Sequence, residues 1–200
     1  MKPNDIPLAP RRRPVQARST VTVEAIFEAS IQVLRSDGLE KFNTTRVAAR
    51  AGVSVGSLYQ YYPNKQSLLA AVLENHLLRV TGKVEAACAQ IRGAPAPDVG
   101  EAIAIAYFNA KIDRADVSSA LYAVAAMVDS RALLDSMRGR IRSAVVAALP
   151  ADIVQPVLVT ETLMGALNGP LQGWLEGELS ADRLDAMRQQ LVRLARAYLS

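Results

Sequence analysis

Cysteine, histidine and tryptophan are almost absent from this chain, whose 200 residues include one of each. The lone Cys88 cannot form an intramolecular disulfide, and one cysteine with one histidine does not make the usual ligand set of a zinc site. The sequence therefore predicts no disulfide, no bound metal and no other cofactor. It favours a reducing compartment, which we take to be the cytoplasm.

Long apolar runs are also missing. The most apolar region, residues 153–176, is interrupted by Glu161 and Asn168, so no uninterrupted apolar stretch in it is long enough to cross a bilayer. Residues 1–17 are rich in proline and arginine and lack the apolar segment of a signal peptide. We therefore expect no contact with a membrane. We expect residues 1–17 to form a disordered basic tail; the alternative is an arm that contacts DNA through Arg11, Arg12 and Arg13.

Enzyme signatures are equally lacking. The sequence has no G-x-S-x-G nucleophile elbow, no phosphate-binding P-loop and no dinucleotide-binding glycine fingerprint. His76 and Cys88 are far apart in the sequence, and no motif brings them together. We therefore expect a protein that is not an enzyme.

What remains is a composition that favours helices and an uneven distribution of charge. Half of the residues are apolar but only 5% are aromatic, and alanine, leucine, valine and arginine dominate. Residues 1–65 carry ten basic and five acidic side chains, whereas residues 66–200 carry thirteen and fourteen. This pattern indicates an all-α chain in which a basic, nucleic-acid-binding part precedes a nearly neutral one.

The most informative stretch is TTRVAARAGVSVGSLYQYYPNK, residues 44–65. Asn43 or Thr44 can cap a short helix, and Gly52 suits the left-handed turn that ends it. Ser54 can cap a second short helix, which Pro63 terminates. Two short helices around a tight turn make a helix-turn-helix, whose second helix enters the major groove of DNA. An ordinary helical hairpin is the alternative.

Side chains that can form hydrogen bonds lie on or near the outward face of the second helix, and Lys65 follows at the start of the next helix. This stretch resembles the tetracycline-repressor (TetR) family of bacterial transcription regulators, most specifically in AGVSxGSLYxYYxNK, and the resemblance runs from about Thr20 to Leu77. It implies phosphate contacts from Thr44, Tyr59, Tyr61 and Lys65. The candidates for base contact are Thr45, Val55, Ser57 and Gln60.

The remaining periodicity predicts about nine helices in two parts. A first helix is expected from about Thr20 to Asp37, with Gly38 as its stop. The resemblance implies that residues 18–64 form a three-helix DNA-binding domain and that residues 65–200 form a helical domain for ligand binding and dimerisation. In the second domain we expect a helix over residues 64–91, a loop over residues 93–100 with Asp98 as the next cap, and a last helix capped by Ser180. Between them, Gly169-Pro170 should kink or interrupt a helix.

The resemblance also implies a small-molecule effector that enters the second domain and shifts the helix that begins near Asn64. The bulkiest side chains there either belong to the ordinary core or line its pocket, where they favour a hydrophobic effector without a strong charge: Tyr107, Phe108, Tyr122, Met127, Met164 and Trp174. Two helices with apolar groups on more than one face predict a homodimer through a four-helix interface. The candidates for that interface are Leu167, Leu171, Leu191 and Val192. The alternative is that both faces are buried within one protomer.

We therefore expect a homodimer that binds double-stranded operator DNA and acts as a repressor released by its effector. Within the same class, the alternatives are an activator or a regulator controlled by another protein. Outside it, the alternative is a helical small-molecule-binding protein whose helix-turn-helix is purely structural. The sequence identifies neither the effector nor the operator.

Overall fold

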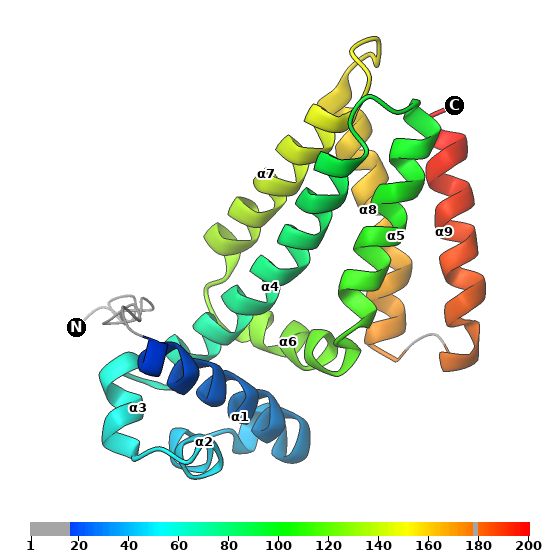
Figure 1. The fold of residues 1–200 in the computed structure, drawn as a ribbon. Helices are drawn as coiled ribbons and strands as arrows, with labels where there is room; N and C mark the ends of the chain where they lie inside the picture. The colour runs from blue at the N-terminus through cyan, green and yellow to red at the C-terminus, as the bar shows by residue number, and fades with distance from the viewer. Residues whose placement is uncertain (1–16, 178–179) are drawn as a thin grey trace. The chain divides into compact units, whose positions relative to one another are not determined.

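The computed structural model describes residues 17–177 and 180–200, and these residues contain α-helices, one short 3₁₀ helix and no strands (Figure 1). The arginine-rich tail, residues 1–16, lies outside them. The helices are α1 (Ala17–Lys41), α2 (Thr44–Ala51), α3 (Val55–Tyr61), α4 (Lys65–Gln90), α5 (Ala96–Ile112), α6 (Ala115–Met127), α7 (Arg131–Ala148), α8 (Pro156–Leu175), the 3₁₀ helix η1 (Ala181–Arg183) and α9 (Leu184–Tyr198). The predicted all-α class is confirmed.

The helices form two compact units, and α4 contributes to both. Of the described residues, one unit holds 17–76 together with 120–130, and the other holds 77–119 and 131–200, apart from 178–179. The first unit contains the helix-turn-helix. Its core is made of side chains with at most 5% exposure, contributed by α1 to α4 and the loop before α2: Ile26, Val33, Leu34, Phe42, Val47, Leu58, Leu68, Leu69 and Val72.

Two capping side chains and one glycine set the ends of the short helices α2 and α3 in the first unit. The Asn43 side chain accepts a hydrogen bond from the Arg46 amide at 2.9 Å and caps α2. Gly52 has φ 68°, a left-handed conformation that costs a residue without a Cβ little. The Ser54 hydroxyl accepts a hydrogen bond from the Ser57 amide at 3.0 Å and caps α3. These caps confirm the predicted turn between two helices.

The second unit is built around a close contact between α5 and α9, which run side by side (Figure 1). A Cβ added at Gly100 would lie 2.6 Å from the Ala195 carbonyl oxygen, so glycine is what allows the two backbones to approach. The core continues into α8 through three leucines, each at most 1% exposed: Leu163, Leu167 and Leu171.

Several predicted boundaries of the second unit were wrong. The loop after α4 is shorter than expected because α5 begins at Ala96, and Asp98 lies in its first turn and pairs with Arg196 instead of capping the helix. Ser180 does not cap α9 directly: its carbonyl accepts the Arg183 amide, and the 3₁₀ turn comes first. Gly169-Pro170, which was expected to kink or interrupt a helix, does not interrupt α8, because that helix continues through Pro170 to Leu175; a kink there stays a prediction.

Candidate nucleic-acid interface

Helix α3 is held in the first unit by its inner face, which leaves its outer face free. Leu58 is fully buried and Tyr62, just after the helix, is 3% exposed. Burial raises the pKa of Tyr62, so this phenol stays protonated. Of the predicted contacts of α3, Tyr59 and Gln60 are exposed, and Tyr61, Val55 and Ser57 are partly exposed. All five are therefore at least partly accessible.

A hydrogen bond joins α3 to the first residue of α2. The Tyr59 hydroxyl lies 3.0 Å from Thr44 Oγ1, and Thr44 is only 7% exposed. The Thr44 hydroxyl thus has a partner inside the unit, and its predicted phosphate contact stays a prediction. Its neighbour Thr45 is exposed. The bond orients the Tyr59 ring at the outer edge of the helix-turn-helix.

Lys65 is tied back to the end of α1. Its ammonium donates a hydrogen bond to the Leu39 carbonyl oxygen at 3.0 Å and lies 5.8 Å from the centre of the Phe42 ring. An ammonium carries three N–H donors, so this contact leaves two for other acceptors. Lys65 therefore links the start of α4 to the end of α1. Its other two N–H donors are the ones that would make the predicted phosphate contact.

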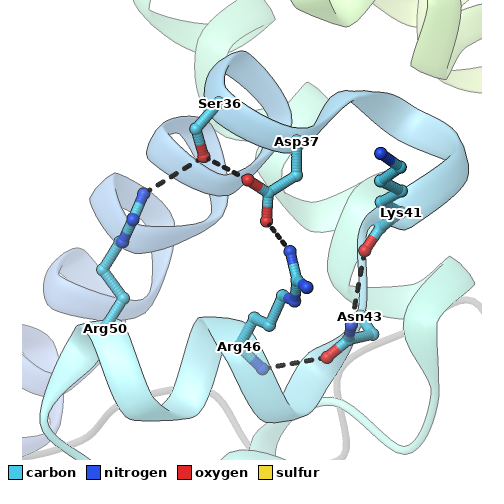
Figure 2. Close-up of polar contacts among 6 residues, drawn as sticks. All are labelled: Ser36, Asp37, Lys41, Asn43, Arg46 and Arg50. Carbon is cyan, nitrogen blue, oxygen red and sulfur yellow. Dashed lines mark hydrogen bonds and ion pairs between the residues drawn. The ribbon is translucent and has the colours of Figure 1, made fainter.

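Two basic residues that the sequence analysis passed over lie on α2. Arg46 and Arg50 are exposed and one helical turn apart, so they lie on the same face (Figure 2). Arg46 pairs with Asp37, and Arg50 donates to the Ser36 hydroxyl at 3.4 Å. The sequence TTRVAARA already indicates them, because its two arginines lie on either side of the buried Val47 and Ala48.

Part of the chain also matches known proteins in sequence. Residues 26–72 match the sequence model of a family described as bacterial regulatory proteins, tetR family. The HTH-type transcriptional repressor DrrR1 of Streptomyces coeruleorubidus is 39% identical over 64 residues, which are 32% of this chain and 24% of DrrR1. The nucleoid occlusion factor SlmA of Actinobacillus pleuropneumoniae is 36% identical over 64 residues, 32% of each chain.

Solved structures extend the match in fold to nearly the whole chain. A putative TetR-family regulator from Mesorhizobium loti superposes with a TM-score of 0.74 at 16% identity, over 92% of this chain and 98% of that one. A putative transcriptional regulator from Pseudomonas aeruginosa gives 0.70 at 21% identity, over 88% and 87%. Residues 26–72 thus carry the DNA-binding domain sequence of the TetR family. At these identities the structural match establishes the fold only, and the sequence matches span about a quarter to a third of DrrR1 and SlmA.

The match of residues 26–72 to this family agrees with the expectation of a regulator that is not an enzyme. Within the part of the chain that the structure describes, no helix is long and apolar enough to span a membrane. The same residues contain no group of three or more histidine, cysteine or acidic side chains that could hold a metal ion.

The predicted effector-pocket residues are not gathered in one place. Tyr107 and Phe108 are buried in the core of the second unit, and Met164 packs against that core. Met127 is 45% exposed and belongs to the first unit, and the side chain of Tyr122 lies outside the described residues. Trp174 is partly buried, and its indole N–H is buried without a partner among the described residues.

Polar contacts in this core were not foreseen. The Tyr107 hydroxyl donates a hydrogen bond to Asn168 Oδ1 at 2.7 Å, which links α5 to α8. One turn further along α5, the Lys111 ammonium lies 5.7 Å from the centre of the Tyr107 ring, and burial lowers its pKa to about 8. An open depression of about 590 Å³ occurs elsewhere, between α4 and α7, and none of the six predicted residues lines it.

The predicted dimer residues lie mainly inside the protomer. Leu167 and Leu171 are fully buried and Leu191 is 4% exposed, all in the protomer's own core, while Val192 is partly buried against it. The sequence pattern failed to separate the two apolar faces of these helices. The exposed apolar side chains lie elsewhere on the same pair and before α8: Val154, Val157, Leu158, Leu194 and Tyr198.

Proposed function

We propose that this chain is a sequence-specific DNA-binding transcriptional regulator that acts as a repressor in the cytoplasm. The observation that carries the proposal is the accessible outer face of α3, where Tyr59 and Gln60 are exposed while Leu58 and Tyr62 anchor the inner face. A short capped helix that is anchored on one face and accessible on the other can lie in the major groove of B-DNA. The matched relative DrrR1 is named as a transcriptional repressor, which supports the direction of control.

The proposed DNA-contacting side chains form two groups, those suited to base edges and those suited to phosphates. Gln60 and Ser57 offer amide and hydroxyl groups that can read base edges, and Val55 offers apolar contact with thymine methyl groups. Tyr59, Tyr61 and Lys65 suit phosphate oxygens. Thr45 belongs to the base-contacting set, whereas Thr44 acts indirectly by orienting Tyr59.

Arg46 and Arg50 add two guanidinium groups on the neighbouring helix α2. Side chains four residues apart on a helix are about 5–6 Å apart at Cβ. Both therefore lie on one face of the helix and are suited to contact a phosphate backbone while α3 occupies the groove.

Selection of duplexes from a random pool by the purified chain tests this proposal. We expect a palindromic consensus sequence and an affinity that falls steeply with salt, because each neutralised phosphate releases counterions. Failure to bind any duplex at low salt would favour the alternative of a helical small-molecule-binding protein with a purely structural helix-turn-helix.

The proposed regulator acts as a homodimer through the exposed apolar side chains of α8 and α9. These two helices run antiparallel (Figure 1), so Leu158 near the start of α8 and Leu194 and Tyr198 near the end of α9 lie toward the same end of the pair. Gly165 and Gly169 are exposed on α8, and a Cβ at either would meet nothing within 4 Å inside the protomer. Both glycines thus leave room for a second helix.

The effector belongs to the second unit in this proposal. The indole N–H of Trp174 is buried without a partner among the described residues, so it is a donor that a bound molecule can satisfy. The sequence favours a hydrophobic effector without a strong charge, and Tyr107 and Phe108 lie in the core of this unit. A thermal-shift screen of paired carboxylic acids and their amides tests whether the effector carries a charge.

A further inference from the structure

The last regular turn of α1 carries a carboxylate that holds an arginine of α2. Asp37 Oδ2 accepts a hydrogen bond from Arg46 Nη1, and Asp37 Oδ1 accepts one from the Ser36 hydroxyl at 2.8 Å (Figure 2). Ser36 in turn accepts from Arg50. Both α2 arginines are therefore tied to two adjacent residues at the end of α1.

The backbone explains why Asp37 occupies this position. Gly38, the next residue, has φ 76° and ψ 169°, a conformation essentially limited to glycine, and it breaks the regular helix there. Asp37 thus ends the regular part of α1, and the chain turns toward α2 directly after it.

The contact between Asp37 and Arg46 is of the same chemical kind as the contact between an arginine and a DNA phosphate. Carboxylate and phosphate oxygens accept hydrogen bonds from a guanidinium in the same way. The Ser36 hydroxyl and Arg46 hold the pKa of Asp37 below its usual value, so the carboxylate is ionised at neutral pH. Asp37 therefore offers Arg46 a permanent anionic partner when no DNA is present.

The pair is accessible enough to be exchanged. The Arg46 side chain is 54% exposed and that of Asp37 is 21% exposed. Ion pairs in contact with water contribute little to stability, because solvent screens the charges. A DNA phosphate reaching Arg46 therefore has only a weak internal competitor to displace.

We propose that Asp37 competes with DNA phosphate for Arg46, so that Arg46 leaves Asp37 when the protein binds DNA. The competition lowers the affinity for every DNA sequence alike and limits binding to non-operator DNA. This inference rests on the proposed DNA-binding function. It assigns to Asp37 a regulatory role that depends on Arg46.

The test compares Asp37→Asn with Glu40→Gln by fluorescence anisotropy on operator and random duplexes. Glu40 is an exposed acid three residues away that has no ion pair among the described residues, so it controls for the loss of one negative charge. We expect Asp37→Asn to bind both duplexes about three- to tenfold more tightly and to steepen the salt dependence by about one phosphate contact. Glu40→Gln should change affinity less than twofold.

A second comparison removes the arginine. In an Arg46→Ala background, Asp37→Asn should have no more effect than Glu40→Gln, because its partner is gone. Asp37→Asn keeps the oxygen that accepts from Ser36, and Asp37→Ser provides a second variant if the first does not fold.

The outcomes separate this inference from the proposed function. A wild-type protein that binds no DNA overturns both. If the wild type binds but Asp37→Asn matches Glu40→Gln, weakens binding, or keeps its effect without Arg46, the competition is excluded and the DNA-binding function stands.

Discussion

The hydroxyl of Tyr59 lies 3.0 Å from Oγ1 of Thr44, and this hydrogen bond joins α3 to the first residue of α2. The two residues are fifteen positions apart, so the bond spans the turn of the helix-turn-helix. Thr44 is 7% exposed, whereas Tyr59 is 41% exposed, so a buried hydroxyl holds the end of an accessible side chain. The bond therefore favours one orientation of Tyr59 in the protein without DNA.

Replacing Tyr59 with phenylalanine tests this relationship. The change leaves the Thr44 hydroxyl buried without its partner, which should lower the free energy of unfolding by about 1–2 kcal/mol. Chemical denaturation of the variant measures this cost. Tyr61→Phe is the matched control, since Tyr61 lies two residues away on the same helix and its hydroxyl has no hydrogen bond among the described residues. Equal stability of both variants would contradict the assigned role of the bond.

Lys65→Ala distinguishes a phosphate contact from a purely structural one. The Lys65 ammonium already donates to the Leu39 carbonyl, so its loss should lower stability slightly whatever its role on DNA. If Lys65 also contacts a phosphate, affinity for operator and random DNA falls together and the salt slope drops by about 0.9. An unchanged salt slope with lowered stability would assign Lys65 to the structure alone.

Gly100→Ala tests the contact between α5 and α9. The new Cβ would lie 2.6 Å from a backbone oxygen of Ala195, which cannot move aside without shifting α9. We expect a loss of about 1–3 kcal/mol in the free energy of unfolding. Gly139→Ala is the control on α7, where nothing lies within 4 Å, and should stabilise by about 0.5–1 kcal/mol through helix propensity. A neutral Gly100→Ala would show that the two helices are not packed this closely.

Two separate substitutions on α9, each replacing a leucine with glutamate, test the proposed dimer surface. Leu194 is 41% exposed and Leu191, three residues earlier, is 4% exposed. Leu194→Glu should give a folded monomer in sedimentation and weaken operator binding, whereas Leu191→Glu should unfold the second unit by burying a charge. A Leu194→Glu protein that remains dimeric would move the interface away from α9.

The sequence predicted the helix-turn-helix well because its signals are local. Asn43, Gly52 and Ser54 each act on a backbone group within a few residues, so the caps and the turn could be inferred without knowing the tertiary structure. The resemblance to the TetR family rests on the same short stretch. Both therefore concern the part of the chain where neighbours in sequence are also neighbours in space.

Contacts between distant residues could not be predicted in this way. Lys65 meets the Leu39 carbonyl across 26 positions, and Arg46 meets Asp37 across nine, and neither pairing has a local signal. In α8 and α9 the apolar residues lie on more than one face, so the pattern did not reveal that Leu167 and Leu191 face the protomer's own core. Which face is buried depends on α5, which packs against both helices.

The most direct test of the central claim is the sequence preference of Gln60→Ala. Gln60 is exposed on α3 and is the proposed reader of a base edge. Anisotropy titrations of the wild type and the variant should be made on the selected operator and on duplexes with each base pair changed in turn. We predict that the wild type discriminates at one position per half-site by about 1–3 kcal/mol and that Gln60→Ala loses this discrimination while retaining its affinity for random DNA. Unaltered discrimination at every position would contradict the placement of α3 in the major groove.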